Sequence, residues 1–287
     1  MVTDSITTIR ARIADARHEA EGRGISSPRV VLVPTMGALH DGHLRLVDEA
    51  QKLGDIVVVS IFVNPLQFGP NEDLSTYPRT LDADVAKLAE HDVHLVFAPT
   101  AAEMYPDGDA STRVTAGDVG SAFEGRTRPG HFDGMLTVVS KLFHIVSPDV
   151  AVFGEKDRQQ LFLVNRMVKD LNVPVEVHGV PIVRADDGLA LSSRNAFLSD
   201  AERRSALVLS KALEAAASAQ SGGIDATLAA AHAVLDGEPS LDLDYLAAVD
   251  PESFSPIDEQ YTGPAVLLIA ARVGATRLID NRTLVVS

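Results

Sequence analysis

Two histidines three positions apart, His40 and His43, lie in the stretch VPTMGALHDGH, residues 33–43. The stretch follows an apolar run and precedes a helical pattern, so the histidines straddle the start of a predicted helix. Glycines in such a turn let the backbone approach a ligand closely, and N–H groups at a helix N-terminus attract anions. Imidazoles there can donate hydrogen bonds to a phosphate as its charge develops. Two alternatives stay open: the histidines are structural, or the pair binds zinc.

Cationic residues occur in two further polar stretches. Lys156 lies in GEKD, residues 154–157, directly after a predicted strand, and Arg194 ends LSSR, residues 191–194. An ammonium group and a planar guanidinium group both bind phosphate oxygens. The alternatives are a solvated surface lysine at position 156 and an ordinary capping turn at 191–194.

The elements that position these residues alternate in type through residue 180. Continuous apolar runs predict strands at 29–33, 55–63, 94–99, 150–154 and 175–180. Helical patterns predict helices at 43–53, 82–91, 134–146 and 158–171, after an N-terminal amphipathic helix with Ile6, Ile9 and Ile13 on one stripe. Apolar strands separated by helices indicate a parallel sheet covered on both faces. Residues 1–183 are therefore predicted to form an α/β domain with a doubly wound, Rossmann-like parallel sheet.

The pattern changes near residue 183, which predicts a smaller C-terminal α+β domain over residues 184–287. Helical patterns cover 199–220 and 224–237, and strand patterns follow at 243–250 and 265–281, the second broken by a hairpin at VGAT. In open α/β sheets, ligands bind beyond the carboxyl ends of the strands. The polar stretches that follow the predicted strands of the first domain are therefore expected to converge on one edge of its sheet.

Composition limits the classes of partner. The 287 residues carry 25 Lys plus Arg against 40 Asp plus Glu, a formal charge of −15 with no basic run, so nucleic acid is not an expected partner. The chain has no cysteine, which excludes disulfides, thiolate zinc sites and a cysteine nucleophile. The N-terminus lacks a signal-peptide pattern, and the apolar runs are far shorter than the roughly 20 residues of a membrane span. We expect a cytoplasmic protein with no membrane partner.

Longer motifs carry a resemblance to a known family. HDGH, residues 40–43, is similar to the HIGH motif of the nucleotidylyl transferases and class I aminoacyl-tRNA synthetases. The chain also resembles the pantothenate synthetase family, whose members are also called pantoate–β-alanine ligases. The motifs that carry this resemblance are, in chain order, PTMGALHDGH, SIFVNPLQF, YPRT, RPGHFDGMLTVVSKLF, GEKDRQQL and DGLALSSRN. The resemblance covers essentially the whole chain, down to RLIDN near its end.

The resemblance implies an ATP-dependent ligase. ATP and pantoate would give pantoyl adenylate and pyrophosphate, and β-alanine would then displace AMP to give pantothenate. The carboxylate of pantoate has a pKa near ~4, so it arrives ionised and needs no general base. The enzyme has to hold two anions together and stabilise the charge that moves onto pyrophosphate. That task calls for His, Lys and Arg donors.

The resemblance also implies the residues of the site. The catalytic residues would be His40, His43, Lys156 and Arg194. The residues that bind ATP would be Met36, Gly37, Ala38, Leu39, His40, Asp41, Gly42, His43, Gly154, Glu155, Lys156, Asp157, Val183, Leu191, Ser192, Ser193 and Arg194. Gln67 and Gln160 would bind pantoate, Gln67 would also meet β-alanine, and Asn64 is a further candidate. Buried amides with structural hydrogen bonds are the alternative for both glutamines.

Several roles near the site stay open. Mg²⁺ is expected to accompany ATP, bound largely by phosphates and water, so no protein ligand is assigned to it. Asp82 and Asp84 are either outer ligands of that ion or residues of a solvated helix N-terminus. Arg128 and His131 either contact a substrate or support the wall of the site. Arg158 stands where the family usually has an aromatic residue.

The resemblance further implies a homodimer, for which an edge strand of the first domain is a candidate interface. The segment 66–80 is rich in Gly, Pro and charged residues. Because an acyl adenylate hydrolyses readily, we expect this segment to act as a gate that excludes water.

Other classes of protein explain the motifs less completely. Another HIGH-motif nucleotidylyl transferase would keep the histidines but has no need of Gln67 and Gln160 in these contexts. A fragment of an aminoacyl-tRNA synthetase conflicts with the acidic charge. A non-catalytic nucleotide-binding regulator is expected to lose His43, Lys156 or Arg194, and this chain keeps all three.

Overall fold

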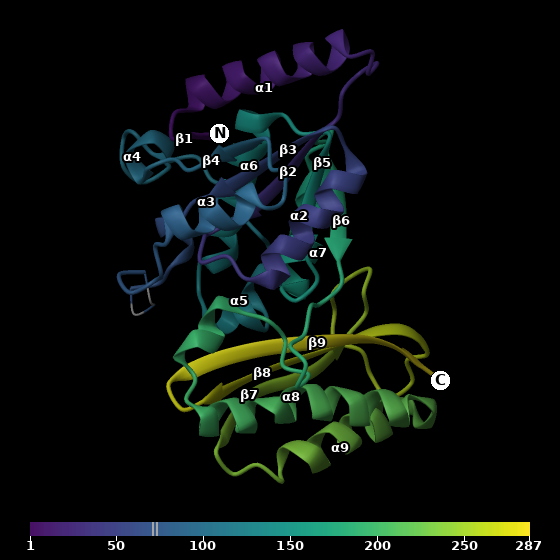
Figure 1. The fold of residues 1–287 in the computed structure, drawn as a ribbon. Coiled ribbons are helices and arrows are strands. Elements are labelled where there is room, and N and C mark those ends of the chain that lie inside the picture. Colours follow the sequence, from purple (N-terminus) through teal and green to yellow (C-terminus); the bar gives the residue numbers. More distant parts are fainter. Residues whose placement is uncertain (71, 73) are drawn as a thin grey trace. The chain divides into compact units, whose positions relative to one another are not determined.

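The structure, a computed structural model, describes residues 1–70, 72 and 74–287 (Figure 1). The chain divides into two compact units, the first formed by Met1–Glu155 and Leu163–Pro181, the second by Lys156–Phe162 and Ile182–Ser287. The predicted gate at 66–80 includes positions 71 and 73, which lie outside the described residues. In the part of the chain that is described, no helix has the length and apolar character needed to cross a membrane.

A six-stranded parallel sheet forms the centre of the first unit. Its strands are β1 (Val2–Thr3), β2 (Val30–Thr35), β3 (Ile56–Ile61), β4 (Leu95–Phe97), β5 (Val150–Gly154) and β6 (Glu176–Val180). Their order across the sheet is β1-β4-β3-β2-β5-β6. The central strands are buried runs of valine, isoleucine and leucine, because β-branched side chains pack well on a sheet that is covered on both faces. The predicted α/β class is confirmed.

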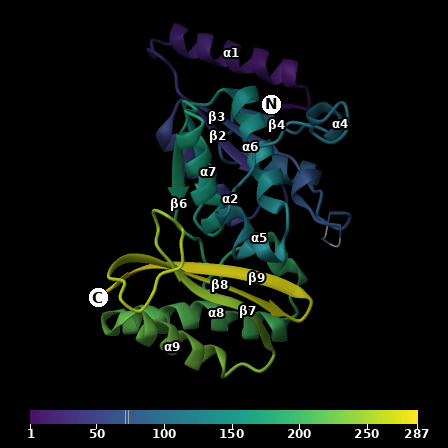
Figure 2. The same cartoon turned by 180° about the vertical axis from the view of Figure 1, so that it is seen from behind.

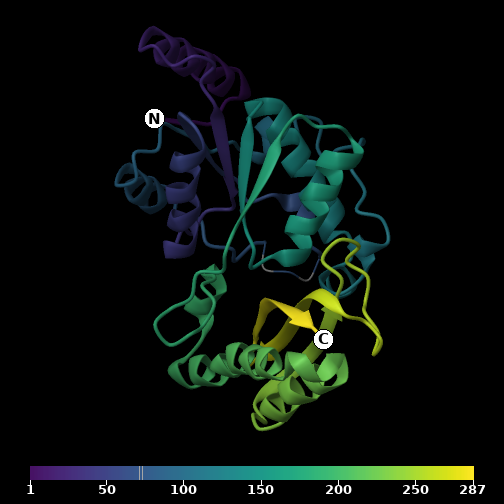
Figure 3. The same ribbon diagram turned by 90° about the vertical axis from the view of Figure 1, so that its right-hand side faces the viewer.

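Helices cover both faces of this sheet (Figure 3). They are α1 (Ile6–Gly22), α2 (Asp41–Leu53), α3 (Leu81–Ala89), α4 (Ala101–Met104), α5 (Glu124–Thr127), α6 (His131–Val146) and α7 (Arg158–Asp170), of which residues 163–170 belong to this unit. Val47 of α2 and Leu88 of α3 share one buried apolar cluster with alternate residues of the strands. Ile9 and Ile13 of α1 are buried, as the apolar stripe predicted.

The carboxyl ends of three neighbouring strands meet at one edge of the sheet. The register pairs Thr35 of β2 with Ile61 of β3, and Leu32 of β2 with Ala151 of β5. From β2 the chain winds one way through β3 and β4, and later the other way through β5 and β6. A reversal of this kind is where open α/β sheets bind ligands. The turns that begin at residues 36, 62 and 155 all follow these strand ends.

The second unit is built on a three-stranded antiparallel sheet. β7 (Leu241–Val249), β8 (Gly263–Val273) and β9 (Thr276–Val286) pair in that order, and α8 (Asp200–Ala219) and α9 (Gly223–Leu235) lie on one face (Figure 2). Ala212 and Leu213 of α8 share a buried apolar cluster with Leu267 and Ile269 of β8. The predicted hairpin joins β8 to β9, with Gly274 at φ 55°, a value that suits glycine in a two-residue turn.

Candidate active site

The turn between β2 and α2 contains both histidines of the HDGH motif. His40 is the N-cap of α2, with extended backbone at φ −131° and ψ 174°. Its Nδ1 atom accepts a hydrogen bond from the Gly42 N–H at 3.1 Å, and the Nδ1 atom of His43 accepts from the His40 N–H at 3.4 Å. This reciprocal pair is a capping box, a device normally built from Ser or Thr and Glu or Gln. The structural role weighed as an alternative for the histidines is therefore present, in the form of this helix cap.

The same contacts fix the tautomer of both rings. Because each Nδ1 accepts a backbone N–H, the neutral form of His40 and of His43 carries its proton on Nε2. This assignment follows from the hydrogen-bond partners. The ring centroids are 4.1 Å apart and the planes are tilted by 39°. Two adjacent Nε2–H donors suit the binding of phosphate oxygens, while the capping bonds hold the rings in place.

The backbone N–H groups before α2 are engaged by oxygens of the protein. The Gly37 N–H donates to Thr35 Oγ1 at 3.2 Å. The N–H groups of Ala38 and Leu39 donate to the carboxylate of Asp84 at 2.9 and 2.8 Å. The N–H groups of residues 37–39 are thus committed to contacts within the protein.

Asp84 corrects an expectation from the sequence. It lies in the first turn of α3, but its side chain is buried, 1% exposed, and bonded to the β2–α2 turn. The interpretation of Asp84 as a residue of a solvated helix N-terminus is therefore wrong, whereas Asp82, two positions earlier, is exposed. Among residues 1–70, 72 and 74–287, no group of three or more His, Cys, Asp or Glu side chains is arranged to hold a metal ion.

Asn64 and Gln67 lie together after β3, around the short 3-10 helix η1 (Pro65–Gln67). Asn64 Nδ2 donates to Gln67 Oε1 and to the Gly134 carbonyl, both at 3.1 Å. Asn64 Oδ1 accepts from the Leu66 N–H and from the Tyr105 hydroxyl. Both hydrogens and both lone pairs of the Asn64 amide are thus used within the protein. This favours a role for Asn64 in holding Gln67, rather than in contacting a substrate.

Gln67 keeps hydrogen-bonding capacity beyond these contacts. Its Nε2 carries two hydrogens and donates to the sulfur of Met36 at 3.2 Å, a weak acceptor. Gly134 of α6 allows η1 to come this close, because a Cβ atom at position 134 would lie 2.1 Å from the Leu66 carbonyl oxygen. Glycine at position 134 is therefore needed to bring Gln67 to the edge of the sheet.

Arg128 and His131 support the same segment. His131 is buried, its Nδ1 lies 2.8 Å from the Gln67 carbonyl oxygen, and its Nε2 lies 3.0 Å from Nη1 of Arg128. The Arg128 guanidinium also donates to both carboxylate oxygens of Glu72. Burial alone would raise the pKa of Glu72, but the hydrogen bond and positive charge of Arg128 outweigh it and hold that pKa below its usual range. Of the two roles left open, support of the wall matches these contacts.

The GEKD stretch crosses the boundary between the two units. Gly154 and Glu155 belong to the first unit, where the Glu155 N–H donates to the Val180 carbonyl at 2.8 Å. Lys156 begins the second unit, and its carbonyl accepts from Nδ2 of Asn281 in β9 at 2.9 Å. Lys156, Arg158 and Gln160 are half-buried, and Asp157 is exposed.

A hairpin in the second unit leads to LSSR. The Leu191 N–H donates to the Val183 carbonyl at 2.9 Å, and the Arg184 guanidinium pairs with both carboxylate oxygens of the buried Asp280 in β9. Ser192 Oγ then caps the 3-10 helix η3 (Ser193–Phe197) by accepting from the Arg194 N–H at 3.3 Å. The capping turn weighed as the alternative is therefore present. It uses Ser192 Oγ as an acceptor, so the hydroxyl proton is still a donor, and the Arg194 side chain is half-buried.

The two units thus divide the predicted site residues. The first unit contains the turn from Met36 to His43 together with Asn64, Gln67, Gly154 and Glu155. The second unit contains Lys156, Asp157, Gln160, Val183 and the stretch from Leu191 to Arg194. Within the first unit, the structure brings the histidine turn and the Gln67 segment together, because Gln67 contacts Met36.

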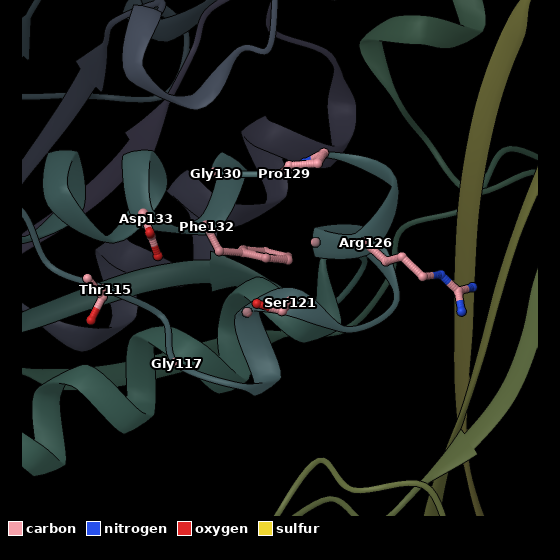
Figure 4. A pocket seen from close by; sticks show the side chains of 10 residues that line it. Thr115, Gly117, Ser121, Arg126, Pro129, Gly130, Phe132 and Asp133 are labelled. Atoms are coloured by element: carbon pink, nitrogen blue, oxygen red, sulfur yellow. The ribbon is translucent and has the colours of Figure 1, made fainter.

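A cavity of about 450 Å³ lies elsewhere in the first unit, around the start of α6. Its lining comes from the segments 115–125 and 126–133 and includes Phe132 and Asp133 (Figure 4). Figure 4 shows Arg126 pointing away from Phe132. The residues that line this cavity include none of those predicted for the site.

The chain is similar to known proteins over nearly its whole length. The family model described as Pantoate-beta-alanine ligase matches residues 2–283. A protein named pantothenate synthetase from Leifsonia xyli subsp. xyli (strain CTCB07) is 61% identical over 279 residues, which cover 96% of this chain and 97% of that protein.

Solved structures give the same result. The crystal structure of pantothenate synthetase from Thermus thermophilus matches with a TM-score of 0.89 and 47% identity over 98% of both chains. The crystal structure of pantoate-beta-alanine ligase from Francisella tularensis, complexed with beta-gamma ATP and beta-alanine, matches with a TM-score of 0.76 and 33% identity over 98% of this chain and 97% of that chain. The resemblance predicted from the motifs is confirmed, and this chain belongs to the pantoate–β-alanine ligase family.

Proposed function

We propose that this chain catalyses the ATP-dependent condensation of pantoate with β-alanine to give pantothenate, AMP and pyrophosphate. The observation that carries the proposal is the His40–His43 capping box at the reversal of the sheet, in a chain that belongs to this ligase family. The complex of the Francisella tularensis relative with beta-gamma ATP and beta-alanine supports the choice of ATP and the amine substrate.

In the first step, a carboxylate oxygen of pantoate attacks the α-phosphorus of ATP and pyrophosphate leaves. The carboxylate is already ionised at neutral pH, so catalysis consists of alignment and of stabilising charge on the phosphoryl oxygens. The Nε2–H groups of His40 and His43 donate to these oxygens. Lys156 and Arg194 bind the phosphates that leave, and Mg²⁺ enters bound to ATP as part of the substrate.

The remaining ATP contacts follow the turns around the sheet edge. Met36 to Leu39 with Asp41 and Gly42 line the nucleotide, Gly154 and Glu155 offer backbone groups, and Asp157 accepts from the ribose. Val183 contacts the adenine through its backbone, and Leu191, Ser192 and Ser193 lie along the phosphates. Gln67 and Gln160 bind the hydroxyl and carboxylate groups of pantoate, and Asn64 holds Gln67.

In the second step, the amine of β-alanine attacks the acyl carbon of pantoyl adenylate. The C–N bond forms, the bond from the acyl carbon to the phosphate oxygen breaks, and AMP leaves with that oxygen. The segment 66–80 acts as the gate that keeps water from the adenylate. The enzyme works in the cytoplasm as a homodimer.

Isotope exchange between pyrophosphate and ATP tests the proposal. Labelled pyrophosphate should enter ATP when pantoate is present and β-alanine is absent, because the first step is reversible without the amine. Addition of β-alanine should then release AMP and pantothenate in equal amounts. Exchange that requires a phosphorylated ester such as phosphopantetheine, and does not occur with pantoate, would overturn the proposal in favour of a nucleotidylyl transferase.

A further inference from the structure

Asp84 is a buried carboxylate for which the proposed reaction has no direct use. Its Oδ1 accepts from the Leu39 N–H at 2.8 Å, and its Oδ2 accepts from the Ala38 N–H at 2.9 Å and from the Thr80 hydroxyl at 3.1 Å. A buried carboxylate is tolerated only when donors compensate for its lost hydration. Here two of those donors are the backbone of the turn that leads into His40.

The turn adopts a backbone conformation that needs external support. Gly37 has φ 85°, and Ala38 has φ 51°, a region that residues with a Cβ atom rarely occupy. A Cβ atom on Gly37 would lie 3.1 Å from Asp84 Oδ2 and equally close to Ile61 Cγ2, so the turn is pressed against α3. The two bonds to Asp84 are contacts that compensate for this unfavourable geometry.

A second side chain of α3 holds the same turn through the next peptide group. Lys87, three positions after Asp84 and thus close to one helical turn along α3, donates from Nζ to the Leu39 carbonyl. Leu39 is therefore held at its N–H by Asp84 and at its carbonyl by Lys87. The next residue, His40, is the N-cap whose Nδ1 accepts from Gly42.

We propose that Asp84, assisted by Lys87, is a positioning residue for the two phosphate-binding histidines. By fixing the backbone at positions 38 and 39, Asp84 sets where His40 enters α2, and the capping box then transmits that position to His43. This inference rests on the proposed function for its effect on catalysis. It assigns Asp84 to the turn, in place of the alternative that Asp84 ligates the Mg²⁺ of the substrate.

The test compares Asp84→Asn with Glu90→Gln. The asparagine is nearly isosteric, but its NH₂ group meets at least one backbone N–H, so a donor faces a donor. We expect kcat for the pyrophosphate exchange to fall about 10- to 100-fold, because small misplacement of catalytic groups costs that much. The KM for pantoate should stay within about twofold, as Gln67 is held by other residues. Glu90→Gln makes the same charge change at the exposed C-cap of the same helix and should leave both constants unchanged.

Two further readouts separate positioning from other roles. Long-range ¹H–¹⁵N NMR spectra should show His40 and His43 as Nε2–H tautomers in the wild type and altered ring signals in Asp84→Asn only, whether or not the enzyme is active. Raising Mg²⁺ should not restore kcat of Asp84→Asn. Recovery at high Mg²⁺ would overturn the proposal in favour of a metal ligand, and so would unchanged histidine signals together with a wild-type kcat.

Lys87→Met gives a test that does not depend on the folding of Asp84→Asn. It removes the donor to the Leu39 carbonyl and keeps an apolar stem, so the variant should fold with a thermal midpoint near that of the wild type. We expect a smaller loss of kcat, about 3- to 10-fold, with the KM for pantoate unchanged. A folded Lys87→Met with wild-type kcat and wild-type histidine signals contradicts the assignment. A wild-type enzyme without pantoate-dependent exchange would instead overturn the proposed function, and the NMR comparison would still test the positioning.

Discussion

At the scale of single residues, the capping geometry gives different tasks to the two nitrogens of each imidazole at positions 40 and 43. Nδ1 is used by the helix, where it replaces the side-chain oxygen of an ordinary capping residue. Nε2 carries the proton and is the atom that can donate to an anion. The structural and functional interpretations of the HDGH motif are therefore not exclusive, because one ring serves both.

Two substitutions at position 43 separate these tasks. Asparagine places an acceptor near the position of Nδ1 and has no group at Nε2, while glutamine places an N–H near Nε2 and removes the capping acceptor. We expect His43→Asn to keep the thermal midpoint of the wild type and to lose about 100-fold in the rate of pyrophosphate exchange. We expect His43→Gln to keep more activity and to lose about 1 kcal/mol of unfolding free energy.

Chemical denaturation and exchange kinetics on both variants measure the two effects. His43→Ala should combine them, with loss of the cap and of the donor. A near-normal exchange rate in His43→Asn would count against the catalytic role of Nε2. Equal stability of all three variants and the wild type would count against the capping role of Nδ1.

At the scale of elements, η1 is held by a polar network that the sequence did not predict. Tyr105, which follows α4, donates its hydroxyl hydrogen to Asn64 Oδ1 at 2.8 Å, and Asn64 in turn holds Gln67. Burial raises the pKa of Tyr105 to about 12. The neutral phenol is thus the form that the folded state prefers.

The sign of the pH effect follows from this shift. A pKa raised in the folded state contributes stability that is present below the unfolded pKa of about 10 and is lost as the pH rises toward about 12. At pH 8 we expect Tyr105→Phe to lower the free energy of unfolding by about 1 kcal/mol and to raise the KM for pantoate, because Asn64 loses a partner. The stability difference between wild type and variant should shrink steadily between pH 10 and pH 12.

Denaturation of both proteins at pH 8, 10 and 11 checks this expectation. Tyr261→Phe is the matched control: it removes a hydroxyl bonded to Asp250 and the Pro264 carbonyl in the second unit, and it should leave the KM for pantoate unchanged. A stability difference for Tyr105→Phe that stays constant up to pH 11 would contradict the neutral, bonded phenol.

Elements with a strong local pattern were predictable, and tertiary contacts were not. The central strands and the helix pair α8 and α9 lie within a few residues of their predicted positions. Apolar runs and helical periodicity are patterns of consecutive residues, so the sequence alone shows them. The two-residue strand β1 carries no such pattern and exists through pairing of Val2 and Thr3 with β4. The burial of Asp84 was missed for the same reason, since its partners lie 45 and 46 positions earlier in the chain.

At the scale of the whole molecule, the units do not follow the order of the sequence. Lys156–Phe162 belongs with the C-terminal part of the chain, and the bond from Asn281 Nδ2 to the Lys156 carbonyl is one contact that ties it there. Asp280, the neighbour of Asn281, holds Arg184 in the hairpin before LSSR. The dipeptide Asp280–Asn281 of β9 thus contacts both Lys156 and the hairpin that leads to LSSR, although 125 positions separate Asn281 from Lys156. The sequence predicted one domain boundary near residue 183. One boundary there does not describe the two units, because residues 156–162 belong to the second unit.

The proposed mechanism requires residues from both units to act on one triphosphate, and a double-mutant cycle tests that requirement. His43 lies in the first unit and Lys156 in the second. If both stabilise the same transition state, the losses in kcat/KM for His43→Ala and Lys156→Ala should not add, and the coupling free energy should exceed about 0.5 kcal/mol. The pair of His43→Ala with Lys211→Ala, which changes an exposed lysine of α8, should be additive. Additive losses for His43 and Lys156 would mean that the two residues serve separate sites, and the shared-triphosphate mechanism would then be wrong.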